Sequence, residues 1–570
     1  MVFGVDDNGC LNAESGERFK GLFFEDANKE VVKYLDELGV LLKLKFITHS
    51  YPHDWRTKKP IIFRATAQWF CSIDKIKDDI LNEIDNNINW LPEWGKVRLH
   101  NMIEGRGDWC ISRQRKWGVP IPIFFCKECG EAHIDNDAMM AVADLFEKEG
   151  SNAWYSHTAA EILPEGTKCK KCGCTEFEKE KDIMDVWFDS GSSHAAVVSK
   201  RDNLRFPADL YLEGNDQYRG WFQSSLLTSV ATEGVAPYKA VLTHGMILDE
   251  EKRKMSKSLG NGISPQDVTE KYGADVLRLW VSSTDYQSDV HISNEILKQI
   301  SESYRKIRNT ARYILGNVYD FNPDTDSVPV NELMPMDKWA IVKLNELIAK
   351  VKQAYDNYEF HQVYHSIRNF CVIDMSNFYL DVLKDRLYTE KSDSKSRKAA
   401  QTAIYIILNA MTRMISPILA YTSDEIWKYM PHSSNEHAEN VIFNEMPNQV
   451  EIETDDDFMS FWDEIHQLRD DVKKSLEGLI KDKTIKSSLE AKVTLKASGK
   501  KLEFLKKAEP ELAAAFIVSA VEIAENDGEL EIAVDKAIGE KCERCWIISE
   551  TVGTDSEHPH LCKRCCSILK

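Results

Sequence analysis

Two lysines in the stretch EEKRKMSKSLGN, Lys254 and Lys257, stand where they could act together on a nucleotide. Serines lie beside them, and Gly260 and Gly262 follow. Glycine gives a loop the freedom to close over a triphosphate. Lysine ammonium groups then offset the charge that builds on the phosphates as pyrophosphate leaves. A solvated basic turn would have the same composition, so this stretch predicts ATP chemistry only in combination with its neighbours.

Four cysteines near the end of the chain have the spacing of a metal site. The pairs Cys542/Cys545 and Cys562/Cys565 enclose sixteen residues, which suits four thiolates around a tetrahedral zinc ion. A tail this short cannot fold by apolar burial alone, so we expect the metal to supply its stability. Cys566 is adjacent to this group but is not expected to be a metal ligand. The alternative is a set of reduced thiols without metal.

A second group of cysteines predicts another zinc site. The pairs Cys126/Cys129 and Cys169/Cys172 enclose thirty-nine residues. Each pair could form a zinc knuckle, with the enclosed residues forming a small inserted segment. Cys174 could replace Cys169 as a ligand. The remaining cysteines have no partner at metal-site spacing and are expected to be packing residues: Cys10, Cys71, Cys110 and Cys371.

The stretch EEKRKMSKSLGN (250–261) is called the lysine loop below. Three further segments precede it: WCISRQRKWGVPIP (109–122), DVWFDSGSSH (185–194) and YLEGNDQYRGWFQSSLL (211–227). Together with LTHGMILDEEKRKMSKSLGN (242–261) they resemble the catalytic domain of class I aminoacyl-tRNA synthetases, and specifically of isoleucyl-tRNA synthetases. The resemblance continues through DVLRLWVSSTDYQSDVHIS (275–293) into the region that follows and the C-terminal cysteines. It covers essentially the whole chain.

The resemblance implies roles for individual residues. Trp187 and Trp221 match positions that wall the isoleucine side-chain pocket, and flat apolar indoles suit a branched aliphatic group. Lys257 matches an ATP-contacting lysine of a mobile loop, with Lys254 beside it. Four residues match positions that contact the aminoacyl-adenylate: Glu213, Gly214, Asp216 and Gln217.

The chain departs from the family pattern at several points. Asn215 and Tyr218 stand where many relatives have Ser and His. The family's His-x-Gly-His motif, whose imidazoles contact ATP phosphates, does not occur in this sequence. VDDNG (5–9) resembles a point near the end of the family's editing insertion, and residues 49–70 resemble the return to the catalytic fold. We therefore expect the C-terminal part of a longer synthetase, lacking the N-terminal half of the catalytic domain and most of the editing domain.

That expectation has functional consequences. A nucleotide site lies where two halves of such a fold meet, so we expect neither adenylation nor editing from these 570 residues alone. In a split enzyme, a partner chain with the N-terminal half would complete the site.

The elements that must position these motifs predict a multidomain α/β plus all-α protein. Apolar residues from Ile296 to Val318 recur at steps of three and four, which predicts an amphipathic helix. Further helical patterns occupy about 338–357, 361–385, 394–415 and 419–430. The expected parts are a remnant of the editing insertion (1–50), the C-terminal half of a Rossmann-type catalytic domain (51–295) with a zinc-knuckle insertion (about 126–182), a helical anticodon-binding bundle (296–450), a small α/β junction region (451–538) and a zinc-binding tail (539–570).

Composition sets the class and the compartment. Apolar residues make up 43% and charged residues 29% of the 570, as in a soluble multidomain protein. The sequence has no long apolar run and no signal peptide, so we expect a cytoplasmic protein without membrane contact. The net charge of −20 argues against a protein that coats nucleic acid unspecifically. A local basic patch for RNA phosphate is still expected, at Lys541, Arg544, Lys563 and Arg564.

The expected function is isoleucine–tRNA ligation in protein biosynthesis, in which ATP, with Mg²⁺, activates isoleucine for transfer to tRNA-Ile. One alternative is a fragment of a valyl-tRNA synthetase, which shares the lysine loop and the tryptophan motifs. The four-cysteine C-terminus favours isoleucine, because valine enzymes of this class usually end in a coiled coil. A second alternative is a noncatalytic tRNA-binding module.

Overall fold

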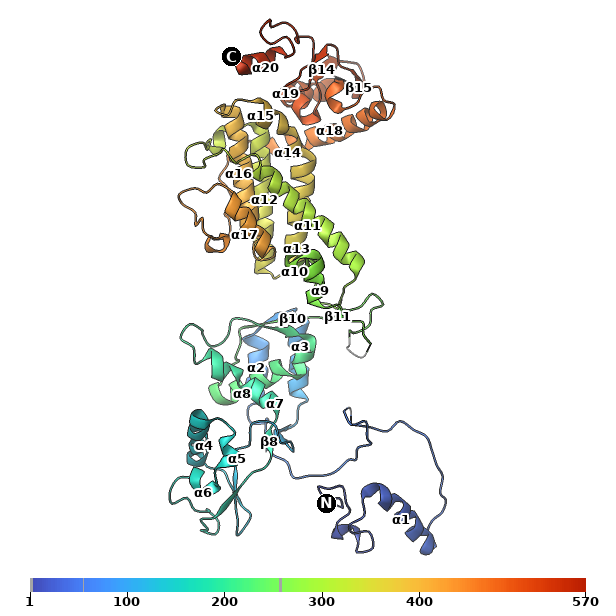
Figure 1. The fold of residues 1–570 in the computed structure, drawn as a ribbon, viewed down its shortest axis with the longest axis vertical. Coiled ribbons are helices and arrows are strands. Elements are labelled where there is room, and N and C mark those ends of the chain that lie inside the picture. Colours follow the sequence, from blue (N-terminus) through green and yellow to red (C-terminus); the bar gives the residue numbers. More distant parts are fainter. Residues whose placement is uncertain (1–3, 55, 256–258) are drawn as a thin grey trace. The chain divides into compact units, whose positions relative to one another are not determined.

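The computed structural model describes residues 4–54, 56–255 and 259–570, and the chain forms two compact units, Met1–Thr243 and His244–Lys570. Figure 1 shows the elements of each unit. In the part of the chain that the structure describes, none of the helices combines the length and the apolar character needed to cross a bilayer.

The first unit begins with helix α1 (Phe24–Glu37), which is anchored by a bidentate ion pair between Arg18 and Glu37. Residues 40–69 then run without helix or strand among those described, apart from a bridge between His53 and Pro60. Large apolar side chains along this run are strongly exposed, among them Leu42 and Phe63 at 99% and 92%. This run therefore contributes little to the core of the unit.

A small parallel sheet and its helices form the core of the first unit. The strands lie in the order β2 (Asn89–Leu91), β10 (Ala240–His244) and β9 (Tyr211–Gly214), and β10 runs parallel to β2. The helices of this core are α2 (Lys77–Asn86), α3 (Trp94–Glu104), α7 (Val186–Gly191) and α8 (Trp221–Glu233). Residues 222–230 of α8 are all buried, including Ser224, Ser225 and Ser229. A helix that is buried on every side needs such small residues where neighbouring backbones approach.

Residues of the predicted insertion share a small sheet and a core cluster. Strand β5 (Phe124–Cys126) pairs antiparallel with β6 (Ala132–His133) and with β7 (Phe177–Lys179). Helices α4 (Asn136–Glu149), α5 (Ala153–Ser156) and α6 (Ala159–Ile162) pack with these strands around Trp154. Short ladders lead into the insertion, between β1 (Phe70–Cys71) and β3 (Trp109–Cys110), and between β4 (Ser112–Arg113) and β8 (Ile183–Met184).

The second unit opens with the segment that carries the lysine loop. Strand β11 (Ile247–Leu248) runs parallel to β12 (Val290–His291), and helices α9 (Pro265–Tyr272) and α10 (Ala274–Ser283) lie between them in sequence. Five residues before the loop, Gly245 lies directly against the backbone of Ser288, where a Cβ atom would come within 2.4 Å.

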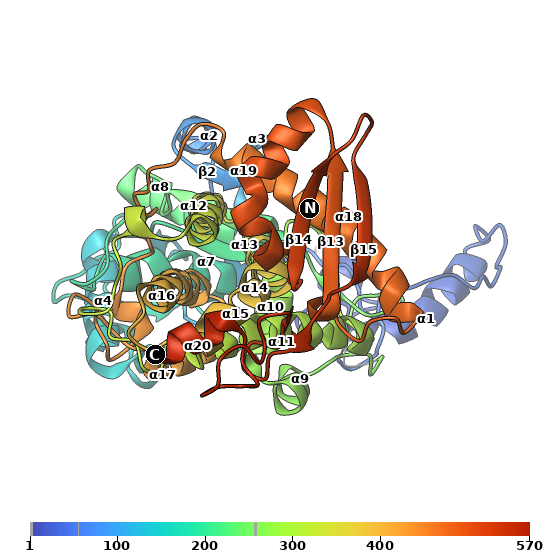
Figure 2. The same cartoon turned by 90° about the horizontal axis from the view of Figure 1, so that it is seen from above.

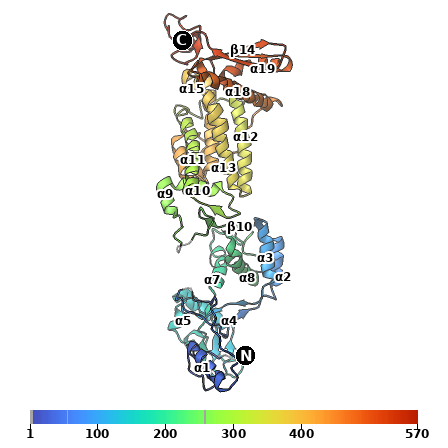
Figure 3. The same cartoon turned by 90° about the vertical axis from the view of Figure 1, so that its right-hand side faces the viewer.

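A helical bundle follows, and Figure 3 shows its long helices side by side. The periodic apolar residues of α11, including Ile300, Ile307 and Ile314, are buried as predicted. The chain winds as a wider π-helix over Phe370–Tyr379. The helices are α11 (Asn294–Leu315), α12 (Pro335–Asp356), α13 (Phe360–Asn369), α14 (Leu380–Val382), α15 (Lys384–Thr389), α16 (Lys395–Ile415) and α17 (Ala420–Tyr429).

A small α/β region and a short tail complete this unit. Strand β13 (Ala491–Ala497) lies between β14 (Ala520–Glu525), to which it is parallel, and β15 (Glu531–Lys536), to which it is antiparallel. Figure 2 shows this sheet beside helices α18 (Phe458–Lys481) and α19 (Gly499–Phe516). The tail contains β16 (Glu540–Lys541), β17 (Ile548–Ser549) and α20 (Lys563–Leu569). The predicted class, α/β plus all-α, is confirmed.

Candidate functional site

The carboxylate of Asp185 accepts hydrogen bonds from residues around Trp187 in the first unit. Asp185 is 4% exposed and caps helix α7, since one carboxylate oxygen accepts a hydrogen bond from the backbone N–H of Trp187 at 3.2 Å. The other oxygen accepts from Trp109 Nε1 at 3.1 Å and from Arg113 Nη2 at 2.7 Å. One buried carboxylate thus holds the backbone of Trp187 in place.

The two tryptophans that were predicted to wall the amino-acid pocket meet around Gly220. The indole of Trp187 lies directly on this glycine, because a Cβ atom on Gly220 would come within 2.8 Å of its ring. The neighbouring Trp221 is stacked on Tyr211 with ring centroids 4.1 Å apart, and its Nε1 donates to the carbonyl of Ser190 at 3.1 Å. Trp187 remains 40% exposed, whereas Trp221 is mostly packed.

A cleft of ≈ 370 Å³ opens beside Trp187. Aromatic, apolar and charged side chains line it, so it offers both an apolar wall and groups that can orient a charged ligand. The lining residues are Arg106, Gly107, Asp108, Trp109, Cys110, Arg113, Asp185, Trp187, Arg219, Gly220, Gln223, Ser224 and Leu227.

The residues predicted to contact the adenylate follow strand β9. Glu213 and Gly214 end the strand, and Asp216 and Gln217 lie in the 3-10 turn Asn215–Arg219. Glu213 and Asp216 are exposed. The side-chain oxygen of Gln217 accepts a hydrogen bond from the backbone N–H at the start of α8, at 2.9 Å. The end of the strand and the turn therefore present one carboxylate each, those of Glu213 and Asp216, while Gln217 helps to fix the turn itself.

Tyr218, which departs from the family pattern, is fully buried in the core. Its hydroxyl lies 2.8 Å from that of Thr243, and its ring packs against Trp90, Trp94 and Phe222. The tyrosine thus serves packing in this chain.

The lysine loop belongs to the second unit. Lys257 lies outside the described residues, whereas Lys254 is described and forms a bridge with Leu248. The carbonyl of Lys254 accepts a hydrogen bond from Asn261 Nδ2 at 3.3 Å. The residues predicted to contact the adenylate lie in the first unit, and Lys254 lies in the second.

Asp249 holds the base of the lysine loop. It is 7% exposed, and its carboxylate accepts from the backbone N–H groups of Glu251 and Arg253, from Arg253 Nε at 3.0 Å and from Asn261 Nδ2 at 2.8 Å. These donors, led by Asn261, lower the pKa of Asp249 to about 2. Asp249 and Asn261 therefore join the two ends of the loop that carries Lys254.

Neither Asp185, Gly220 nor Asp249 was singled out from the sequence. For Asp185 a signal existed, because an aspartate directly before a short helical pattern is a common N-cap. For Asp249, an acidic residue that precedes a turn by two to four positions is a common side-chain cap of that turn. The contact of Gly220 with Trp187 left no local signal, because the two residues are far apart in sequence.

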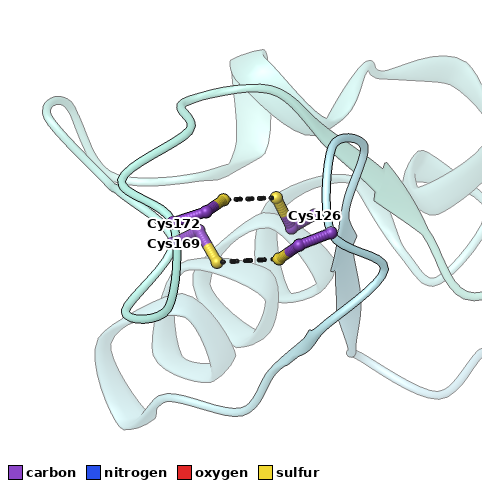
Figure 4. A group of neighbouring side chains, drawn as sticks. Cys126, Cys169 and Cys172 are labelled. Carbon is purple, nitrogen blue, oxygen red and sulfur yellow. Dashed lines mark hydrogen bonds between the residues drawn. The ribbon is translucent and has the colours of Figure 1, made fainter.

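The first predicted cysteine cluster is assembled in the insertion. The Sγ atoms of Cys126 and Cys172 are 3.5 Å apart, those of Cys129 and Cys169 are 3.6 Å apart, and Figure 4 shows the two loops facing one another. The group that could hold a metal contains Cys169 and not Cys174. The backbone N–H of Cys129 is the leading cause that lowers the pKa of Cys126 to about 6, which favours a thiolate.

The C-terminal cluster brings together Cys542, Cys545, Cys562 and Cys565, all of them buried. The Sγ atoms of Cys545 and Cys562 are 3.7 Å apart. Burial opposes ionisation of Cys542, but backbone N–H donation from Cys545, Cys562 and Arg544 outweighs it and lowers its pKa to about 6. Cys566 is buried outside the group.

Both clusters fit zinc. Zinc–sulfur bonds of about 2.3 Å in a tetrahedron put sulfur atoms about 3.8 Å apart, close to the separations in both clusters. Four thiols at such distances cannot all ionise without a cation between them. The cysteine sets are therefore consistent with two structural zinc sites.

The comparisons with known proteins agree with these features. Residues 22–293 match the family described as tRNA synthetases class I (I, L, M and V). Residues 337–495 match the anticodon-binding domain of tRNA ligase, and residues 539–568 match a zinc finger found in FPG and IleRS.

Curated relatives and solved structures extend the comparison. The isoleucine–tRNA ligase of Caldicellulosiruptor saccharolyticus is 52% identical over 572 residues, which cover 100% of this chain and 62% of the relative. The ligase of Bacillus mycoides is 52% identical over 99% of this chain and 62% of its own length. A methionyl-tRNA synthetase of Mycobacterium tuberculosis in complex with methionyl-adenylate aligns over 66% of this chain and 65% of its own, with 18% identity and a TM-score of 0.48.

The chain thus spans 62% of the length of these curated ligases. The three matched families follow one another along the chain, at residues 22–293, 337–495 and 539–568. The chain belongs to the isoleucyl-tRNA synthetase family of class I aminoacyl-tRNA synthetases.

Proposed function

We propose that this chain performs its part of isoleucine–tRNA ligation, in which isoleucine is activated by ATP and transferred to tRNA-Ile. The observation that carries the proposal is the 52% identity to an isoleucine–tRNA ligase along the whole of this chain. We also propose the cytosol as its compartment, since both cysteine clusters need reduced thiols to bind zinc.

The amino-acid site is proposed at the cleft beside Trp187. The exposed indole supplies an apolar wall for a branched aliphatic side chain, and ≈ 370 Å³ is ample for one amino acid. Asp185 positions Trp187, and Gly220 lets the edge of the indole approach the backbone closely. Trp221 is stacked on Tyr211 and is not among the residues that line this cleft.

The activation step needs charge stabilisation more than covalent help from the protein. The isoleucine carboxylate attacks the α-phosphorus of ATP, an acyl–phosphate bond forms and pyrophosphate leaves. Lys254 and Lys257 would offset the charge on the departing pyrophosphate, and Mg²⁺ brought in with the ATP substrate would share that role. Glu213 and Asp216 supply acceptors suited to hydroxyl groups of the adenylate.

The transfer step needs tRNA. The terminal ribose hydroxyl of tRNA-Ile attacks the carbonyl carbon of the adenylate, and AMP leaves. We propose that the helical bundle holds the anticodon region, in keeping with the matched anticodon-binding family. Aromatic and guanidinium groups on such a surface can stack on unpaired bases.

Binding of tRNA tests the proposal on the chain as it is. Fluorescence anisotropy at one fixed salt concentration would compare labelled tRNA-Ile with tRNA-Val, because phosphate contacts alone give salt-dependent binding without preference. We expect tighter binding of tRNA-Ile. Tighter binding of tRNA-Val would favour the valine alternative, and equal weak binding of both would contradict the proposal.

Pyrophosphate exchange tests the catalytic part. The assay would use the 570-residue chain alone and together with the segment of a relative that carries the His-x-Gly-His motif. We expect isoleucine-dependent exchange only when the segment is added, and exchange by the chain alone would contradict the expectation that its nucleotide site is incomplete. Preferential tRNA-Ile binding without exchange in both mixtures would favour a noncatalytic tRNA-binding module instead.

A further inference from the structure

Two of the basic residues beside the C-terminal cysteines bind the protein itself. Arg564 makes a bidentate ion pair with Asp385, with Nη1 and Nη2 at 2.6 and 2.7 Å from the two carboxylate oxygens. Arg544 donates from Nε and Nη2 to the backbone carbonyl of Thr389, at 3.2 and 2.8 Å. These arginines therefore attach the tail to helix α15 of the bundle.

The two arginines hold α15 near both of its ends. Asp385 lies in the first turn of the helix and Thr389 is its last residue. The last carbonyls of a helix have no intrahelical donor and carry partial negative charge, so a guanidinium is a favourable partner there. The contact is thus suited to this helix and differs from a chance surface pair.

Helix α15 is itself fixed in the bundle. Arg386 makes two hydrogen bonds of 2.8 Å to the carboxylate of Asp337, which is fully buried in α12. The hydroxyl of Tyr379 donates to the same carboxylate at 2.7 Å. The tail therefore docks on a rigid part of the bundle.

The same arginines adjoin the metal ligands. Arg544 precedes Cys545 and Arg564 precedes Cys565. Four thiolates around a divalent cation leave a net charge of about −2, which a neighbouring guanidinium offsets. Arg564 thus connects the carboxylate of Asp385 to the cysteine cluster.

The tail has little else to hold these arginines in place. Its core consists of the four cysteines with partly buried Ile547, Val552 and Leu561. Without a cation, the close thiols would repel one another once ionised, and the small apolar contribution could not keep the arginines aligned. Metal binding and docking on α15 should therefore depend on each other.

We propose that Asp385, which holds Arg564 next to the ligand Cys565, supports the C-terminal zinc site and so couples metal binding in the tail to docking of the tail on helix α15. The carboxylate fixes Arg564, and Arg564 orients and stabilises the ligand set. Because the coupling free energy is the same in both directions, docking that strengthens metal binding by a given factor means that the metal strengthens docking by the same factor. The proposal concerns the metal site alone and holds whether or not the ligase activity is found.

Metal affinity of matched variants tests the proposal. The full chain with C172S as common background retains one complete four-cysteine cluster, and D385N would be compared with D381N in it. Asp381 is a close control, because it lies four residues earlier, pairs with Lys384 at 2.6 Å and is similarly exposed, 38% against 42%. Competition with a chromophoric zinc chelator would give the affinities.

We expect D385N to bind zinc about tenfold more weakly, at the lower end of the effect of removing a group bonded directly to a ligand, because Asp385 acts through Arg564. D381N should stay within about twofold of the background. R564K, which keeps the charge but loses the bidentate fork, should fall between them. Equal affinities of D385N and D381N, whether both unchanged or both reduced, would overturn the proposal.

Amide hydrogen exchange gives a second readout without the C172S change. In the otherwise unmodified chain, removal of metal with a chelator should increase exchange in residues 385–390. In D385N that exchange should already be raised with metal bound, while D381N should behave as the unmodified chain. If metal removal left exchange of this helix unchanged, the coupling would not exist.

Discussion

Single residues set the geometry around Trp187. Asp185 holds the N-terminus of its helix, and Gly220 provides the surface on which the indole lies. Neither residue offers an obvious catalytic group. Both act by fixing an aromatic side chain that would otherwise sample other rotamers, so their effects should appear in stability and ligand binding together.

Substitution of Gly220 by alanine tests this arrangement. A Cβ atom at Gly220 would lie 2.5 Å from Gln217 Oε1, the end of a flexible side chain, and 2.8 Å from the Trp187 ring. We expect a loss of about 1–3 kcal/mol in the free energy of unfolding, as for an overpacked site, and a changed tryptophan emission. Urea titration would measure both.

Gly107 provides the control, because a Cβ atom there meets nothing within 4 Å. G107A should unfold within about 0.5 kcal/mol of the unmodified chain. If G220A were equally stable, the indole would not rest on this glycine.

At the scale of elements, side chains that join distant parts of the sequence decide how loops and helices are held. Asp249 and Asn261 close the lysine loop at its base. Helix α18 packs on the bundle through His466, whose ring lies 4.1 Å from Phe378 and 4.9 Å from Trp339 between centroids. The first connection can be tested by proteolysis of the loop, and the second by the pH dependence of unfolding.

The substitution N261A should loosen the lysine loop. It removes the hydrogen bonds of Asn261 to Asp249 and to the carbonyl of Lys254. A loss of about 1 kcal/mol of local stability raises the opened population about fivefold. Trypsin should therefore cut after Lys252, Arg253 and Lys254 about fivefold faster, as followed by mass spectrometry of early digests.

Gln266 provides a control for that digestion. Its amide donates to Glu270 on the surface of α9 at 3.1 Å, and Q266A should leave cleavage in the lysine loop unchanged. Equal rates for N261A and the unmodified chain would show that the connection between Asp249 and Asn261 does not restrain the loop.

His466 should make the docking of α18 sensitive to pH. Burial, with a contribution from Arg469, lowers the pKa of His466 to about 4. The unfolded chain binds a proton near pH 6.5, so the stability contributed by the neutral ring is present above pH 6.5 and is lost as pH falls toward 4. With partial exposure taken into account, the loss is about 1–2 kcal/mol.

Urea unfolding of H466Q and of the unmodified chain at pH 7.5 and pH 5 would measure this effect by circular dichroism. The difference in stability between the two pH values should be smaller in H466Q. His437, which is exposed, supplies the control H437Q, whose pH dependence should match that of the unmodified chain. An unchanged pH dependence in H466Q would contradict this role of the ring.

On the scale of the whole molecule, two cysteine clusters stabilise parts that have small apolar cores. One lies in the insertion of the first unit and the other in the tail of the second. In both, structural zinc would replace the apolar burial that such short segments lack. The number of zinc ions bound per chain therefore tests both clusters together.

Purified chain should contain two zinc ions per molecule by elemental analysis. The variants C172S and C565S should each contain one, because each removes a ligand from a different cluster. Acidification should release zinc from both clusters, since metal ligation requires deprotonated thiols. Fewer than one zinc per chain in the unmodified protein would refute the two-site assignment.

Features that depend on neighbouring residues were determined by the sequence itself. The steps of three and four from Ile296 onward predicted α11, because a helix places such residues on one face. The CxxC spacing predicted both clusters, because the two cysteines of each pair lie within one turn of a knuckle. The π-helical winding over Phe370–Tyr379 was not predicted, since it depends on contacts with other helices, such as the bond from Tyr379 to Asp337.

Only the tertiary structure decided how separate segments meet. It selected Cys169 over Cys174 for the first cluster, placed Trp187 on Gly220, closed the lysine loop with Asp249 and joined Arg564 to Asp385. The physical reason is that local sequence fixes backbone preference and residue spacing, whereas contacts between distant residues depend on how whole elements pack. The lysines, tryptophans and cysteines expected to bind ligands could therefore be predicted from the sequence. The residues that hold them in place could not.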